Sequence, residues 1–239
     1  MRSSDQPIIP SDLLLLAYRN GIFPMSDGRH DPEVFWVEPK QRAILPLDGF
    51  VLSRSLAKAI RQERFEVTCN AAFDRVIAQC AEPRPDHPES WISARIVASY
   101  RALHAHGYAH SIECWRDGDL VGGLYGVGFD RVFCGESMFS RADNASKVAL
   151  AWLVAVLRRS GARLLDCQFM TDHLASLGAV EIPQESYVAL LGEAAAAVGD
   201  DDAGGAVALP EGFAALEAEA SGLGLSPAKL ILQSLTQTS

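Results

Sequence analysis

A helix that is apolar on nearly every side most constrains the fold of this chain. The stretch over about 145–160 carries large apolar side chains at Val148, Leu150, Trp152, Leu153, Val154, Val156 and Leu157. A helix that is hydrophobic all round has no face for water, so it must be buried inside a larger fold. Asn144 is its expected N-cap, and Gly161 is expected to end it. With 239 residues, the chain is long enough to supply that core.

Three β-rich runs precede this helix, and one follows it. Residues 110–116, 119–128 and 131–134 alternate or run apolar, and the run from Arg163 to Phe169 is the expected strand after the helix. An antiparallel meander, a buried helix and a further strand match the order of the acyl-CoA N-acetyltransferase fold. We therefore expect an α+β fold with a mixed, mostly antiparallel sheet flanked by helices.

Charge is distributed unevenly along the chain. The net charge is -9, and the segment from Gly192 onward holds seven acidic residues and one lysine, which leaves only -3 on residues 1–191. The body of the protein can therefore present a basic surface. A basic stripe repeats at helical spacing after Ser53, a possible N-cap, and it consists of Arg54, Lys58, Arg61 and Arg64. By itself, such a stripe is more often a solvated helix face than a binding site.

Cysteine usage and hydropathy bound the class of protein. The five cysteines are scattered without a Cys-x-x-Cys pair, which favours reduced thiols and a cytoplasmic location over disulfides or structural zinc. No apolar run approaches the roughly 20 residues of a membrane span. We expect no membrane partner and no metal site.

Reactive side chains cluster around the strand that follows the buried helix. Asp166 and Gln168 are two residues apart in that strand, so they share one face and could orient and deprotonate an attacking amine. The alternative is a structural aspartate that closes a turn. Glu136 follows a glycine at a strand end, where it could hold a cation or be an ordinary surface glutamate. No Gly-x-Ser-x-Gly motif is present, which disfavours a serine hydrolase.

At these residues the chain resembles the leucyl/phenylalanyl-tRNA–protein transferase family. The resemblance covers roughly residues 11–191 in order. The matching runs are Tyr18-x-x-Gly21-Ile22-Phe23-Pro24, Arg42 to Pro46, Ser90-Trp91-Ile92, His110 to Glu113, Val121 to Gly126, Gly135 to Ser140, Asn144 to Lys147, Asp166-Cys167-Gln168, and Ser176 to Ala179.

The resemblance implies a domain organisation and an activity. It implies a small N-terminal α/β domain over residues 1–48 and an N-acetyltransferase-like catalytic domain over 49–191. Residues 192–239 lie outside the resemblance, and their composition predicts an acidic Ala/Gly-rich tail with weak structure over 192–222 and a short terminal helix that begins at Ser226-Pro227. The implied enzyme is a monomer that moves Leu or Phe, and Met less well, from aminoacyl-tRNA to proteins with N-terminal Arg or Lys. The product is recognised by the bacterial N-degron pathway.

The resemblance also implies roles for individual residues. Asp166 and Gln168 would activate the acceptor α-amine, and Glu136 would meet the acceptor's positive side chain. Leu124, Met138, Leu153 and Leu157 would line the pocket for the transferred side chain. Trp36 and Trp91 would lie near the tRNA 3′ adenosine or the peptide. The basic stripe would bind the tRNA acceptor stem.

Two other functions are consistent with parts of the sequence. An acyl-CoA N-acetyltransferase would need a glycine-rich loop to hold a pyrophosphate at the helix N-terminus, but residues 140–147 contain no glycine. A non-enzymatic module that binds tRNA or protein N-termini would give the pair Asp166 and Gln168 no purpose. An aminoacyl ester is already activated, so the transferase needs proximity and a base, and we expect no cofactor.

Overall fold

A seven-stranded mixed sheet forms the centre of the protein. The computed structural model describes residues 7–83, 89–197 and 207–236. The strand order is β4-β5-β6-β7-β8-β3-β9, and all neighbouring strands are antiparallel except β7 and β8, which are parallel. The strands are β3 (Gln41–Ile44), β4 (Glu66–Cys69), β5 (Ala109–Arg116), β6 (Asp119–Phe129), β7 (Val132–Ser140), β8 (Leu164–Gln168) and β9 (Val180–Pro183). The α+β fold with a mostly antiparallel sheet is thus confirmed.

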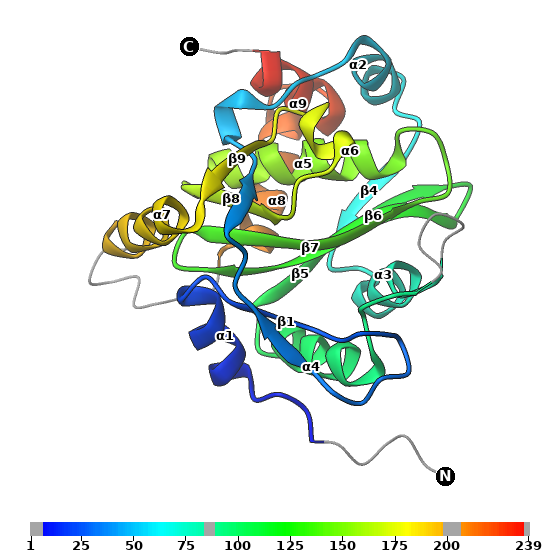
Figure 1. Cartoon of the computed structure of the whole chain (residues 1–239). Coiled ribbons are helices and arrows are strands. Elements are labelled where there is room, and N and C mark those ends of the chain that lie inside the picture. The colour runs from blue at the N-terminus through cyan, green and yellow to red at the C-terminus, as the bar shows by residue number, and fades with distance from the viewer. Residues whose placement is uncertain (1–6, 84–88, 198–206, 237–239) are drawn as a thin grey trace.

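Helices cover both faces of this sheet, each over its own hydrophobic core. Figure 1 shows α5, α8 and α9 on one side of the sheet and α3 and α4 on the other. The helices are α1 (Ser11–Arg19), α2 (Arg54–Arg61), α3 (Phe73–Cys80), α4 (Ala94–Ala105), α5 (Ala145–Arg159), α6 (Asp172–Ala175), α7 (Gln184–Ala196), α8 (Leu209–Gly222) and α9 (Pro227–Thr236), with a short 3-10 turn over Leu47–Gly49.

Helix α5 is the buried helix that the sequence predicts. Every residue from Val148 to Leu157 is buried, and the meander β5-β6-β7 precedes the helix as expected. Its close approach to the sheet depends on Gly122, because a Cβ there would lie 2.4 Å from the Cβ of Ala145. Asn144 occupies the N-cap position as predicted, but it has a left-handed backbone and makes no side-chain capping bond.

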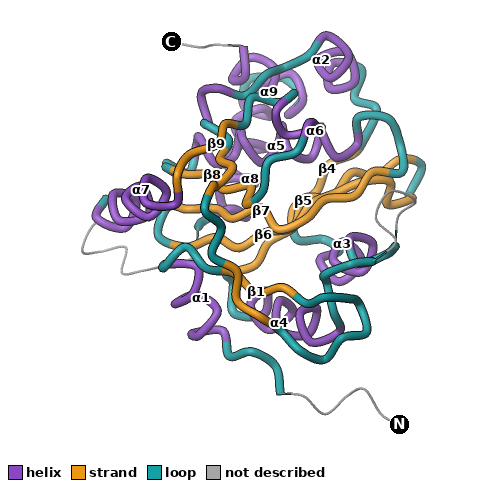
Figure 2. The backbone as a smooth tube through the Cα atoms, viewed as in Figure 1, coloured by secondary structure: helices purple, strands orange, loops and turns teal. Residues whose placement is uncertain are grey.

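The N-terminal segment contributes to the main sheet. A separate two-stranded sheet pairs β1 (Phe23–Met25) with β2 (Phe35–Val37), and β1 lies beside the start of α4, where Ser26 donates to Ser93 (2.9 Å) (Figure 2). The next strand, β3, falls within residues 1–48 but lies between β8 and β9. The main sheet therefore does not divide at residue 48.

The C-terminal segment is more ordered than its composition suggests. The terminal helix expected near Ser226-Pro227 is present as α9. The expectation of weak structure over 192–222 is wrong where the structure describes it, because α7 extends to Ala196 and α8 covers Leu209–Gly222. Residues 198–206 and 237–239 lie outside the described part. Among the described residues, no helix combines the length and the apolar character needed to span a membrane.

Candidate active site

A cavity of about 770 Å³ opens where the two parallel strands of the sheet separate. Strands β7 and β8 are in register from Val132↔Leu164 to Cys134↔Asp166, and no pairing follows. Beyond that point Gly135 and Glu136 of β7 and Cys167 and Gln168 of β8 line the cavity. A gap between splayed strands of one sheet is a typical position for a ligand site.

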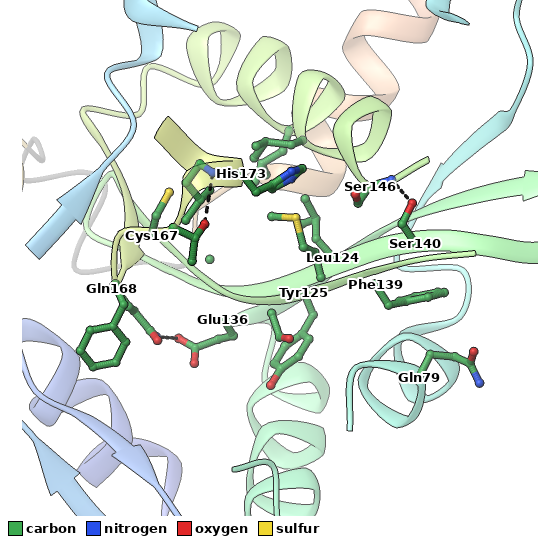
Figure 3. Close-up of a pocket in the computed structure, with 18 of the residues that line it drawn as sticks. Gln79, Leu124, Tyr125, Glu136, Phe139, Ser140, Ser146, Cys167, Gln168 and His173 are labelled. Atoms are coloured by element: carbon green, nitrogen blue, oxygen red, sulfur yellow. Dashed lines mark hydrogen bonds between the residues drawn. The ribbon is translucent and has the colours of Figure 1, made fainter. Parts of the chain in front are cut away.

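A β-bulge directs Glu136 into this gap. Tyr125 of β6 pairs with Ser137, but the next residue, Gly126, pairs with Gly135, so Glu136 is the extra residue on β7. Bulges commonly re-aim a side chain next to an active site. Figure 3 shows Glu136 and Gln168 pointing toward each other across the gap, where the Gln168 Nε2 donates to Glu136 Oε1 at 2.9 Å.

Two buried tyrosines complete the surroundings of Glu136. The Tyr18 hydroxyl donates to Oε1 at 2.7 Å and the Tyr100 hydroxyl to Oε2 at 3.1 Å. Tyr18 comes from α1 and Tyr100 from α4, so these two helices meet at this carboxylate. Burial raises the pKa of Glu136 to about 7, although the hydrogen bonds from Tyr18, Gln168 and Tyr100 oppose this and the nearby Asp166 adds to it.

Asp166 lies next to this group but outside the cavity. Its carboxylate accepts two bonds from the Arg42 guanidinium, with Nε to Oδ1 at 2.9 Å and Nη2 to Oδ2 at 2.5 Å. Both side chains are 0% exposed. The Tyr187 hydroxyl and the Gln168 backbone N–H also donate to Asp166, at 3.1 and 2.8 Å. Burial alone would lower the pKa of Arg42, but Asp166 raises it above its ordinary value.

The structure places the two predicted catalytic residues differently. The sequence predicts that Asp166 and Gln168 together activate an amine; Gln168 lines the cavity, whereas the Asp166 carboxylate is surrounded by donors and lies off the cavity wall. Asp166 accepts a hydrogen bond from the backbone N–H of Gln168. Gln168 has a φ of 62°, a left-handed conformation that is uncommon for a residue with a side chain.

The cavity has an apolar side and a polar side. The apolar side faces α5 and contains the predicted Leu124, Met138 and Leu153, together with Leu150, Leu165 and Leu174. The polar side contains Glu136 and Gln168. Figure 3 shows Leu124, Ser146 and His173 on the α5 side, away from Glu136. The prediction for Leu157 is wrong, because this residue is buried in the core one helical turn beyond Leu153 and does not line the cavity.

The remaining predicted residues lie in three places. Trp91 lines the cavity, whereas Trp36 is 42% exposed on β2 and is not part of its wall. The basic stripe lies on and just after α2, with all four side chains exposed and Ser53 capping the helix as predicted. Figure 1 places α2 beside α9, so the stripe is separate from the cavity wall.

Sequence reasoning missed several residues of this site, among them Tyr18, Arg42, Tyr100 and Leu150. Tyr18 and Arg42 belong to runs that carry the family resemblance, yet nothing in their spacing assigns them a role. Tyr100 lies in an amphipathic helix and Leu150 in a helix that is apolar all round, so neither stands out locally. Among the described residues, no group of three or more His, Cys, Asp or Glu side chains could hold a metal ion.

Comparison with known proteins identifies the family. The leucyl/phenylalanyl-tRNA protein transferase family model matches residues 44–192, and the model of the N-terminal domain of that transferase matches residues 9–40. A leucyl/phenylalanyl-tRNA–protein transferase of Novosphingobium aromaticivorans is 64% identical over 256 residues, covering 97% of each chain. Proteins of the same name from Rhizorhabdus wittichii and Rhodospirillum rubrum are 60% and 49% identical, covering 82% and 87% of this chain and 79% and 96% of their own.

Among solved structures, the C-terminal domain of a lysylphosphatidylglycerol synthetase from Agrobacterium fabrum covers 85% of this chain and 61% of its own, with 14% identity and a TM-score of 0.32. The family is established by the two family models and by the sequence relatives. The chain belongs to the leucyl/phenylalanyl-tRNA–protein transferase family.

Proposed function

We propose that this protein transfers Leu or Phe, and Met less well, from aminoacyl-tRNA to the α-amino group of proteins that begin with Arg or Lys. The transfer would mark those proteins for the N-degron pathway. One observation carries the proposal: a single cavity joins an apolar wall to a buried carboxylate and amide pair. The names of the relatives supply the donor and acceptor classes.

The apolar side of the cavity suits the transferred side chain. Leu124, Met138, Leu150 and Leu153 provide an aliphatic surface without a charged group. Such a surface accepts Leu, Phe and Met because a methylene more or less in an apolar pocket discriminates by only about 1–3 kcal/mol. It would reject charged and strongly polar amino acids, which would lose their hydration without gaining a partner.

The polar side suits the acceptor amine. Gln168 donates an amide N–H to Glu136. This bond fixes the orientation of the Gln168 amide, whose oxygen can then accept a hydrogen bond from another donor. Asp166 and Arg42 hold the backbone of Gln168 from behind the cavity wall. Because an aminoacyl ester is already activated, positioning and one proton acceptor are sufficient, and the proposed reaction uses no metal or other cofactor.

Transfer of labelled Leu to a peptide with N-terminal Arg or Lys tests this function. Leu- and Phe-charged tRNA should be good donors and Met-charged tRNA a weaker one, while a peptide beginning with Ala and an Nα-acetylated peptide should accept little. Gln168→Ala should lower the rate of transfer about 100-fold, as misplacement of a reacting group commonly does. Gln233→Ala, at an exposed position on α9, should leave the rate unchanged. Absence of transfer by the wild type would refute the proposed function.

The basic stripe on α2 is the proposed tRNA contact. Its four side chains are exposed, and within the described part of the chain none of them forms an ion pair. Lys58→Glu with Arg61→Glu should weaken tRNA binding and reduce the slope of log K against log salt by about 1 for each lost phosphate contact. Filter binding of aminoacyl-tRNA over a salt series measures both quantities.

A charge-matched control separates a local contact from an effect of net charge. Arg95→Glu, near the start of α4 on the opposite side of the molecule from α2 (Figure 1), changes the net charge by the same amount as the single α2 variant Arg61→Glu, with which it is compared, and does not touch the stripe. It should leave the salt slope unchanged. If the α2 variant and the Arg95 variant alter binding equally, tRNA does not contact α2.

A further inference from the structure

A large aromatic side chain lies uncovered in the wall of the cavity. Phe169 directly follows Gln168, lines the cavity and is 46% exposed. A single exposed apolar side chain is common on a protein surface and needs no explanation by itself. This one differs because it belongs to the wall of a substrate cavity and adjoins the residue that the proposed function places at the acceptor amine. It therefore presents apolar surface to a bound substrate.

The ring of Phe169 rests on a buried neighbour. Strand β8 ends at Gln168, whose φ of 62° turns the chain out of the strand. The ring then packs edge-on against the ring of Phe23 in β1, with centroids 5.6 Å apart and planes at 77°. Phe23 is 0% exposed. This edge-to-face contact holds the Phe169 ring at the cavity while leaving much of its surface open.

The apolar surface continues from Phe169 along one face of the sheet formed by β1 and β2. Phe23 pairs with Val37, and Met25 pairs with Phe35. Directly paired residues of an antiparallel ladder point to the same face, as do residues two apart in one strand. Phe35, which is 43% exposed, therefore lies on the face that carries Phe23. A peptide that leaves the cavity past Phe169 meets apolar side chains there.

The two ends of the cavity differ in polarity. Figure 3 shows Gln168 at one end and Ser140 and Gln79 at the other. At the second end the guanidinium of Arg141 donates to Gln79 and is paired with Glu82. Polar and cationic groups suit the phosphates and sugars of a nucleic acid. The aromatic end beside Gln168 is therefore the better path for the acceptor chain, and the polar end for the tRNA.

We propose that Phe169 binds the side chain of the second residue of the acceptor protein and favours large apolar side chains at that position. The inference rests on the proposed function and adds a preference for the residue that follows the N-terminal Arg or Lys. Consecutive Cα atoms are about 3.8 Å apart in any chain, and Phe169 is next to Gln168. When the α-amine lies at Gln168, the second side chain is within reach of the Phe169 ring.

The expected preference is moderate because the ring is only half covered. An aromatic or aliphatic side chain lying on it removes apolar surface of both groups from water. Glycine covers nothing, and an acidic side chain would lose hydration without gaining a partner. Enclosed apolar pockets discriminate by about 10–200-fold for one methylene, so a half-exposed ring should give about 5–10-fold for a whole side chain.

Acceptor peptides that begin Arg-X and are identical after X test this role. With labelled Leu-tRNA, the wild-type kcat/KM should be about 5–10-fold higher for X = Phe than for X = Gly, mainly through KM. Phe169→Ala should lower this ratio to below about 2 and change kcat/KM for the Gly peptide by less than about twofold. Phe169→Tyr, which keeps an aromatic ring, should retain the preference.

Phe169→Lys should exchange one preference for another. A lysine at the same position attracts an acidic second residue, so the peptide with X = Glu should become about 2–5-fold better than the Gly peptide at low salt, and this advantage should disappear at high salt. A residue that only supports Gln168 or the fold would not change the preference in this way. Each ratio compares two peptides with one enzyme preparation, so partial misfolding of a variant cancels.

Val188→Ala is the matched control, since this apolar residue on α7 is 42% exposed and lies outside the cavity wall. It should keep the wild-type ratios. Equal wild-type transfer to the Phe and Gly peptides, or an equal loss on both in Phe169→Ala, would overturn the inference. A higher KM for Leu-tRNA with an unchanged peptide ratio would also overturn it, because the ring would then stack on a base. Transfer by the wild type to none of the Arg peptides would instead refute the proposed function itself.

Discussion

Arg42→Met is expected to lower the free energy of unfolding by about 3–5 kcal/mol, since it leaves the Asp166 carboxylate buried without its counter-charge. The two side chains are fully buried, and the guanidinium also donates to the Gly21 carbonyl oxygen at 3.2 Å. The ring of Tyr187 lies 4.4 Å from the Arg42 Cζ, so the substitution also removes a cation–π contact. Urea unfolding followed by circular dichroism measures the loss.

An exposed ion pair provides the matched control. Arg101 donates to Asp74 at 2.8 Å, and the two side chains are 50% and 67% exposed. Arg101→Met should therefore cost no more than about 1 kcal/mol. The double variant Arg42→Met with Asp166→Leu should recover much of the loss, because it removes both buried charges. A loss below about 1 kcal/mol for Arg42→Met alone would contradict the importance of this pair.

Local patterns predict the central elements of the fold well. The meander, the buried α5 and the following β8 are each encoded by a short stretch of hydrophobic periodicity. The basic helix α2 and its cap Ser53 follow equally from local spacing. These features depend on residues that are neighbours in sequence, so the sequence contains all the information that they require.

Long-range pairing is where sequence reasoning fails. Alternation correctly places Asp166 and Gln168 on the same strand, but it cannot show that Arg42, 124 residues away, covers the carboxylate. Nor does it reveal that β3 inserts between β8 and β9, which is what brings Arg42 there. The orientation of Glu136 depends on a bulge relative to β6, and a bulge is a property of two strands together.

The C-terminal segment shows a different limitation. Its Ala and Gly content predicts weak structure, yet α8 is stabilised by tertiary packing that composition does not reveal. Phe213 of α8 stacks on Trp152 of α5 with ring centroids 5.2 Å apart. Arg158 of α5 donates to the Ser234 carbonyl oxygen of α9 at 2.8 Å. The apolar surface all round α5 is explained by these contacts, because the sheet covers only one side of the helix.

Removal of residues 207–239 is therefore expected to prevent stable folding. The deletion would uncover the outer face of α5 and remove nine buried side chains from the core: Val207, Leu209, Phe213, Leu216, Ala220, Ala228, Leu230, Ile231 and Leu235. Burial of one large aliphatic or aromatic side chain contributes about 1.5–3 kcal/mol. Seven of the nine are larger than alanine, so the combined loss of about 10–20 kcal/mol is comparable to the roughly 5–15 kcal/mol by which most domains are stable. Insoluble expression, or a soluble protein without a cooperative thermal transition, is the expected result.

Point variants in α8 measure how much its packing against α5 contributes to stability. Phe213→Ala should cost about 3–5 kcal/mol, as loss of a buried aromatic ring usually does. Leu223→Ala, at the exposed C-cap position of α8, should change stability by no more than about 0.5 kcal/mol. The inner face of α5 supplies Leu150 and Leu153 to the cavity, so α8 and α9 hold a wall of the active site without lining it. A truncated protein that folds and transfers Leu normally would show that the sheet alone positions α5.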